Sequence, residues 1–204
     1  MTFLEDGPRR APWTIVLAHG AGAPMDSPFM NRVASGLAAS GHRVLRFEFP
    51  YMQKRRETGR GGGPDREPVL RKAWAEAIAA AGKPAKLVIG GKSMGGRIAS
   101  MVVDDSGVAG LVCLGYPFHP PGQPTRLRTA HLEKLETRAL IVQGTRDPFG
   151  TEDDVAGYRL SRQIALHWLG DGDHDWKPRK ASGRTHDRNL DEGIAAITGF
   201  IEVL

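Results

Sequence analysis

Short apolar runs alternate with amphipathic stretches along this 204-residue chain, and this alternation restricts the possible folds more than any other feature. Runs that are this short and uniformly apolar are typical of strands covered on both faces of a parallel sheet. We assign six strands, at residues 13–18, 42–47, 87–90, 108–114, 140–143 and 164–169. Strands that alternate with helices predict right-handed crossovers and helices on both faces of the sheet.

Helix boundaries are indicated by capping residues and by apolar side chains that repeat every three or four positions. Ser27 is expected to cap a helix whose first residue is Pro28. Further helices are expected after Pro68, after the cap Thr151 with an acidic first turn, and along the apolar stripe that ends at Leu204. The sequence therefore predicts an α/β class with about six mainly parallel strands.

Two long segments lack such signals and are expected to be loops. Residues 50–67 are polar, and residues 116–138 are rich in proline with at most one short helix near residues 131–135. Neither segment is long enough to form a large lid domain. Residues 1–204 are therefore expected to form a single domain, a length that can bury a full core without disulfides.

The composition is that of a globular protein, with 40% hydrophobic and 25% charged residues. The only cysteine, Cys113, lies in an apolar run and is expected to be buried, so neither a disulfide nor a paired-cysteine metal site is expected. The amino terminus lacks a secretory signal pattern, and no apolar stretch is long enough to span a membrane. We expect a cytoplasmic protein with no membrane partner and no cofactor.

The net charge of +5 is compatible with acidic partners but does not require them. The densest basic run contains Lys54, Arg55 and Arg56, with Arg60 close behind, and it precedes a glycine-rich stretch. No aromatic residues alternate with these charges, as they do in proteins that bind single strands. We interpret the run as a solvated, mobile loop and expect no nucleic-acid partner.

A Gly-x-Ser-x-Gly motif, residues 91–95, follows the third predicted strand and precedes a predicted helix. In such a tight turn the glycines avoid clashes and the serine is presented at the tip, which makes Ser93 a candidate nucleophile. Gly91-Lys92-Ser93 could also end a phosphate-binding P-loop. That motif requires a glycine five residues before Gly91, where this chain has Lys86.

Two further candidate catalytic residues follow later strands. Asp147 comes after the fifth strand and could orient a histidine, although an aspartate before Pro148 could simply cap a turn. His174 comes after the sixth strand, in an acidic turn, and is the candidate base. Asp171 and its neighbours lack the full pattern of a calcium loop, so no metal site is expected there.

The other histidines fit different roles. His186 is the fallback base, whereas His131 is expected on a surface helix. His42 and His167 lie at or in strands and are expected to have surface or core roles. His19, directly after the first strand, is expected to hold its loop in place.

The loop after the first strand also completes a candidate oxyanion hole. The expected donors are the backbone N–H groups of Met94 and of Ala21, with Gly22 as the alternative to Ala21. The residues after the fourth strand are expected to line the substrate pocket, namely Tyr116, Phe118 and His119.

The chain order Ser93, Asp147, His174 is the order of nucleophile, acid and histidine in α/β-hydrolases. Together with residues 19–30, 90–97, 144–150 and 171–175, it makes the chain resemble compact bacterial α/β-hydrolases. This compact type is related to the hydrolase-like subunit of the non-specific lethal chromatin complex, which the chain also resembles. The resemblance implies an α/β-hydrolase fold with a serine triad on the three residues named.

These features predict a carboxylesterase-like serine hydrolase that acts on a carboxylic ester or related small acyl substrate through an acyl-enzyme. Lys92, Arg97 and Arg146 lie near the candidate site in sequence, so an acidic substrate is a further possibility. Two alternatives stay open, because a fold does not fix a function: a non-catalytic interaction module and an acyltransferase. The sequence predicts neither the substrate nor the oligomeric state.

Overall fold

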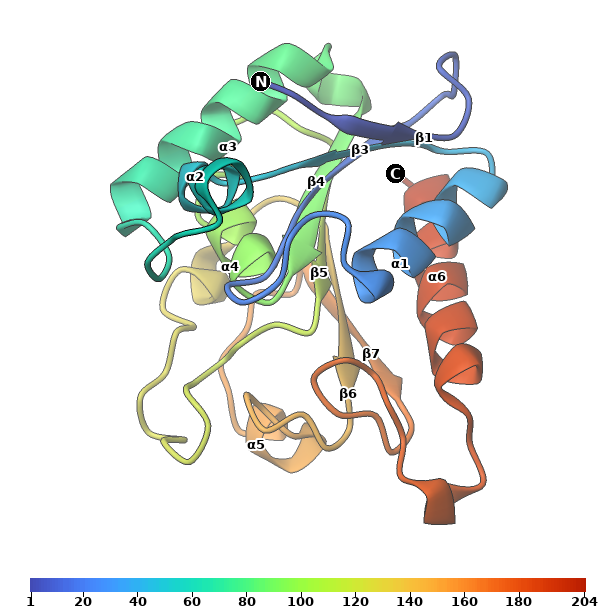
Figure 1. Ribbon diagram of the computed structural model, residues 1–204. Coiled ribbons are helices and arrows are strands. Elements are labelled where there is room, and N and C mark those ends of the chain that lie inside the picture. Colours follow the sequence, from blue (N-terminus) through green and yellow to red (C-terminus); the bar gives the residue numbers. More distant parts are fainter.

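The computed structural model describes residues 1–204 and contains one seven-stranded sheet in the order β1-β3-β2-β4-β5-β6-β7 (Figure 1). Neighbouring strands from β3 to β7 in this order pair in parallel, and β1 pairs antiparallel to β3. The strands are β1 (Leu4–Asp6), β2 (Thr14–Ala18), β3 (Arg43–Phe47), β4 (Leu87–Lys92), β5 (Gly110–Leu114), β6 (Ala139–Gly144) and β7 (Ile164–Leu169).

The six predicted strands are confirmed, and the sheet gains β1 as an additional edge strand. β1 has three residues, of which Leu4 and Glu5 are exposed, so it carries no apolar run that could identify it. Its position depends on long-range pairing, in which Leu4 lies opposite Arg46 of β3.

Helices cover both faces of the sheet (Figure 1). On one face lie α1 (Pro28–Ala39) and α6 (His186–Glu202), which pack against each other. On the other lie α2 (Pro50–Thr58), α3 (Glu67–Ala81) and α4 (Met94–Ser100), while α5 (Glu152–Ala156) follows β6. The predicted caps Ser27 and Thr151 each accept a hydrogen bond from the first turn of their helix.

Each face has its own apolar core with an aromatic pair. Trp74 of α3 contacts Phe47 of β3 edge to face, with ring centroids 4.8 Å apart. Across the sheet, Trp176 contacts Phe29 of α1 in the same manner at 4.9 Å. Both faces are therefore covered, as the uniformly apolar strands predicted.

Of the two expected loops, the first differs from the structure and the second agrees with it. Residues 50–58 form α2 instead of a mobile loop, and the basic residue Arg56 on it pairs with Glu48 and Asp26. The segment between β5 and β6 contains only a 3-10 turn, at residues 132–134, and no lid domain is inserted. No helix in the structure is both long and apolar enough to cross a membrane.

Candidate active site

Ser93 lies in the turn between β4 and α4, at the carboxyl edge of the sheet. Its backbone has φ 51° and ψ −115°, a conformation that non-glycine residues adopt rarely and that is typical of functional sites. A Cβ on Gly91 would lie 2.1 Å from the carbonyl oxygen of Ala18, and a Cβ on Gly95 would lie 2.5 Å from the same oxygen. Both glycines are therefore required because β2 passes so close to the turn.

His174 and Asp147 form a hydrogen-bonded pair. His174 Nδ1 lies 2.7 Å from Asp147 Oδ2, which leaves Nε2 of the ring free. Asp147 is fully buried, and its other oxygen accepts the backbone N–H of Phe149 at 2.9 Å. A buried carboxylate that is held in this way fixes the ring orientation and stabilises an imidazolium.

Gln143, a residue that sequence reasoning missed, supports this pair from β6. Its amide nitrogen donates to Asp147 Oδ2 at 3.0 Å, and its amide oxygen accepts the backbone N–H of Tyr116 at 2.7 Å. Gln143 is fully buried. A glutamine near the end of an otherwise apolar strand is the signal that could have identified it, because buried amides require partners.

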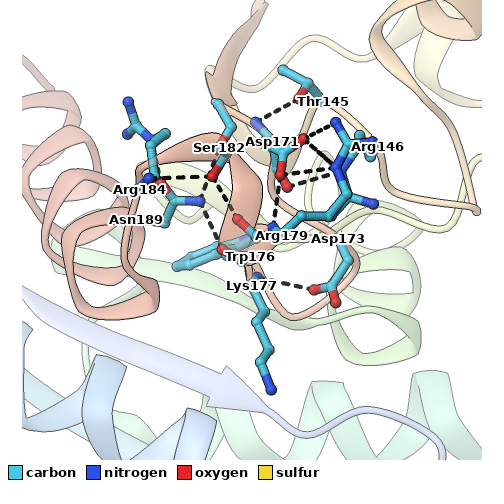
Figure 2. Close-up of polar contacts among 11 residues, drawn as sticks. Thr145, Arg146, Asp171, Asp173, Trp176, Lys177, Arg179, Ser182, Arg184 and Asn189 are labelled. Carbon is cyan, nitrogen blue, oxygen red and sulfur yellow. Dashed lines mark hydrogen bonds and ion pairs between the residues drawn. The ribbon is translucent and has the colours of Figure 1, made fainter.

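The turn that carries His174 is anchored through Asp171 (Figure 2). Arg146 donates to the backbone carbonyl of Asp171 at 3.0 Å, and Arg179 contacts the carboxylate with its Nε at 2.9 Å. Hydrogen bonds from Arg179 lower the pKa of Asp171 to about 2. No group of three His, Cys, Asp or Glu side chains is arranged to hold a metal ion, and here the turn uses arginines as partners.

The far side of the turn is attached to α6. The Asn189 side chain donates to the backbone carbonyl of Trp176 at 2.8 Å, and Asp173 accepts the backbone N–H of Lys177 at 2.9 Å (Figure 2). Trp176 is fully buried and packs against Gly193, where a Cβ would lie 2.8 Å from the indole. The position of His174 thus depends on the docking of the last helix.

Lys92 connects the serine turn to the histidine turn. Its Nζ donates a short hydrogen bond to the carbonyl of His174 and lies 3.2 Å from Asp175 Oδ1. The side chain is only 10% exposed, and burial lowers the pKa of its amine. Lys92, the residue before the serine, therefore has a structural role, because it connects the two turns.

The candidate oxyanion donors lie at the expected places. Met94 is the first residue of α4, so its N–H has no partner within the helix. Ala21 and Gly22 follow β2, and neither of their N–H groups donates within the protein. The role expected of His19 is confirmed, since Nδ1 donates to the carbonyl of Gly20 at 2.7 Å and Nε2 accepts the N–H of Phe49 at 3.1 Å.

An open cavity of about 810 Å³ lies between the loop after β2, the serine turn and the histidine turn. Ser93 and His174 both line it, together with Ala21 and Gly22. Ser93 Oγ makes no hydrogen bond, so the serine and the histidine share the cavity without being hydrogen-bonded to each other. The rest of its wall combines apolar and charged side chains, among them Pro28, Phe29, Phe149, Leu190, Arg32 and Lys177.

The residues predicted to line the substrate pocket are not at this cavity. Tyr116 and Phe118 are fully buried and His119 is 3% exposed. Gly115, with φ 70°, turns the chain after β5, and the side chains of Tyr116 and Phe118 enter the core on the α4 side of the sheet, whereas His119 lies 3.6 Å from the carboxylate of Asp154. The prediction was wrong because the end of a strand does not determine which way the following loop turns.

His131 also differs from the prediction, because it is half-buried and does not lie on a surface helix. Its Nε2 lies 2.8 Å from Ser100 Oγ, and burial lowers the pKa of the ring. This is a second serine–histidine pair, but Ser100 is buried, donates to the carbonyl of Arg97 and does not line the cavity. No carboxylate hydrogen-bonds to His131.

Cys113 is buried as predicted, and burial raises the pKa of its thiol. The basic residues Arg97 and Arg146 do not line the cavity; their carboxylate contacts are with Glu67 and Asp171. They therefore give no support to an acidic substrate, and of the three residues considered only Lys92 reaches the cavity.

The sequence pattern of the alpha/beta hydrolase domain family matches residues 11–202. The chain belongs to this family. The fold agrees, with a mostly parallel sheet between two helical layers, and the candidate residues follow the strands in the order of an α/β-hydrolase triad.

Solved structures of other α/β-hydrolases share this fold. An α/β serine hydrolase without a lid from Xanthomonas campestris is 19% identical, with a TM-score of 0.67 over 95% of this chain and 87% of the other. An esterase domain from Rhodothermus marinus is 17% identical, with 0.66 over 96% and 89%. A dienelactone hydrolase from Anabaena variabilis is 18% identical, with 0.67 over 97% and 89%. At such identities the similarity concerns the fold.

Proposed function

We propose that this protein is a serine hydrolase, that its whole chain acts as one α/β-hydrolase domain, and that it cleaves a carboxylic ester or a related small acyl compound. The observation that carries the proposal is the hydrogen-bonded pair of buried Asp147 and His174, because the histidine lines the same cavity as Ser93. Neighbours of the same fold that are named esterase and dienelactone hydrolase favour ester cleavage over other acyl chemistry.

In the proposed reaction Ser93 Oγ attacks the acyl carbonyl while its proton passes to His174 Nε2. The N–H groups of Met94 and of Ala21 or Gly22 stabilise the oxyanion. The tetrahedral species then expels the alcohol, which takes the proton from His174. Water, deprotonated by His174, attacks the acyl-enzyme and releases the carboxylic acid and free Ser93.

The serine–histidine hydrogen bond is expected to form when a substrate occupies the cavity, because such contacts often tighten only in the complex. Pro28, Phe29, Phe149 and Leu190 supply an apolar wall, and the volume of about 810 Å³ lies in the range of small-molecule sites. We therefore expect a small acyl compound with an apolar group.

The alternative is an interaction module without turnover, as suggested by the resemblance to the hydrolase-like subunit of the chromatin complex. The observation in its favour is that Ser93 Oγ makes no hydrogen bond to His174. An acyltransferase would share the acyl-enzyme and would differ only in the acceptor that takes the acyl group from Ser93.

Labelling with a fluorophosphonate tests the proposal, since this reagent phosphonylates activated serines. We expect the natural protein to be labelled, and labelling to be lost in Ser93→Ala and reduced by at least about a thousandfold in His174→Ala. Ser100→Ala and His131→Ala are the matched controls, because they remove the second serine–histidine pair and should leave labelling intact.

Labelling that is lost in Ser100→Ala instead would refute the assignment of the nucleophile. A folded natural protein that is not labelled would refute the hydrolase proposal and favour the interaction module. Once labelling is established, adding alcohols to a hydrolysis assay separates the remaining two functions, because only an acyltransferase forms the new ester in preference to the acid.

A further inference from the structure

Tyr51 lies in the first turn of α2, beneath the loop that follows β2. Its hydroxyl donates to the backbone carbonyl of Ala21 at 3.0 Å and lies 3.3 Å from that of Gly20. The side chain is 6% exposed and does not line the cavity. The buried phenol therefore holds the Ala21 carbonyl of the candidate oxyanion loop from behind and lies beside the Gly20 carbonyl, to which His19 Nδ1 also donates.

The direction of these carbonyls determines the direction of the neighbouring N–H groups. All peptide bonds are trans, so each N–H points opposite to the carbonyl of the same peptide unit. The carbonyls of Gly20 and Ala21 point to Tyr51, and the N–H groups of Ala21 and Gly22 consequently point away from it. Those two residues line the cavity, and neither N–H has a partner within the protein.

Tyr51 is itself held in a defined position. Its backbone N–H donates to Asp65 Oδ2 at 2.9 Å, and its ring packs edge to face on His19 with centroids 5.7 Å apart. Burial raises the pKa of its hydroxyl to about 12. The group therefore stays a protonated donor throughout the neutral range, as its contacts require.

We infer that Tyr51 is a positioning residue for the oxyanion hole, which aims the N–H groups of Ala21 and Gly22 at the reacting carbonyl. The inference rests on the proposed function, because it needs an oxyanion at Ser93. The inference adds Tyr51, which lies outside the catalytic motifs, to the residues that shape the candidate active site. The phenol acts through the backbone and has no contact with the substrate.

The test compares Tyr51→Phe with the natural protein in hydrolysis of 4-nitrophenyl acetate. Loss of one oxyanion donor costs about a hundredfold or more in kcat, and a misaimed donor should cost less, so we expect kcat to fall about tenfold with KM within about twofold. Affinity for a phenylboronic acid, which forms a tetrahedral adduct on serine, should fall by a similar factor.

Tyr116→Phe is the matched control. Tyr116 is also buried, and its hydroxyl likewise donates to a backbone carbonyl, that of Arg128 at 2.9 Å, away from the cavity. We expect both variants to show similar thermal stability, and only Tyr51→Phe to lose kcat and boronate affinity.

Equal kcat and boronate affinity in Tyr51→Phe and the natural protein, with the natural protein active and labelled, would overturn the inference and leave the proposed function intact. An equal loss in both phenylalanine variants would also overturn it, since the loss would then follow stability. A natural protein without esterase activity or labelling would overturn both the inference and the proposed function.

Discussion

The amine of Lys92 is shared between two groups of the turn that carries His174, namely the backbone carbonyl of His174 and the carboxylate of Asp175. Both contacts lie beside Gly115, where a Cβ would approach the Lys92 Nζ to 3.2 Å. The close packing at Gly115 therefore holds the serine turn and the histidine turn near each other. A single buried cation thus sets the separation of the two turns that meet at the cavity.

We predict that Lys92→Met weakens both folding and catalysis. The methionine keeps most of the buried volume but leaves the His174 carbonyl without its donor, which should reduce the free energy of unfolding by about 1–3 kcal/mol. The looser histidine turn should lower kcat/KM for an acetate ester severalfold. Urea unfolding and steady-state kinetics measure the two effects.

Lys54→Met is the control for this prediction, because Lys54 lies exposed on α2 and makes no ion pair. It should change neither quantity. Identical behaviour of the two methionine variants would show that the Lys92 contacts contribute nothing.

At the scale of elements, β4 and α4 are joined so tightly to β2 that small residues are obligatory. Gly95→Ala would place a Cβ 2.5 Å from the carbonyl of Ala18 and 2.6 Å from that of His19. We predict a loss of about 1–3 kcal/mol in the free energy of unfolding, because the backbone of β2 must move. Activity should also fall under conditions where the variant is fully folded, because the same two carbonyls directly precede the oxyanion loop.

Gly199→Ala in α6 is the matched substitution, since a Cβ there would meet nothing within 4 Å. Alanine favours a helix over glycine by up to about 1 kcal/mol, so this variant should be stabilised. Chemical denaturation of both variants checks the pair. A neutral Gly95→Ala would contradict the requirement for close packing at the turn.

The sequence predicted the elements whose stabilisation is local or repetitive. The six apolar strands and the helix capped by Ser27 were recognisable because burial and capping impose patterns within a few residues. α2 was missed because it is polar on most positions and buries only Tyr51 and Met52. Its position depends on tertiary contacts such as that from Arg56 to Glu48, which no local pattern shows.

In the candidate site, too, the residues with a local sequence pattern could be predicted, and those that depend on tertiary contacts could not. Glycine spacing and strand order indicated Ser93, Asp147 and His174, and the catalytic roles of these three are still predictions. Tyr51 was missed because its hydroxyl contacts a backbone carbonyl 30 positions away in the sequence. Gln143 was missed although Asp147 is only four positions away, because its other partner, the backbone N–H of Tyr116, is 27 positions away. The direction of the chain after Gly115 also could not be predicted, because it follows from one positive φ angle.

At the scale of the whole molecule, buried histidines make the fold sensitive to acid. Burial lowers the pKa of His19 and of His42, and neither nitrogen of His42 has a hydrogen-bond partner. Below an ordinary pKa near 6.5 the unfolded chain binds protons that the folded chain does not. Stability should therefore fall as the pH decreases from about 6.5 through the lowered folded values.

We predict that the free energy of unfolding in urea decreases between about pH 6.5 and pH 5, before the carboxylates titrate. In His42→Gln this decrease should be smaller, because one of the groups that takes up protons on unfolding is gone. A flat profile over that range in the natural protein would contradict the prediction.

The attachment of the histidine turn to α6 has a consequence for the order in which the site is completed. Ser93 and the oxyanion loop belong to the first half of the chain, whereas Trp176 and Asn189 fix His174 only when α6 is docked. A ribosome that has synthesised the first 185 residues has therefore produced a serine without a positioned base. Ser93 would become reactive only after α6 has docked. Acylation of Ser93 would therefore report that the chain has completed its folding.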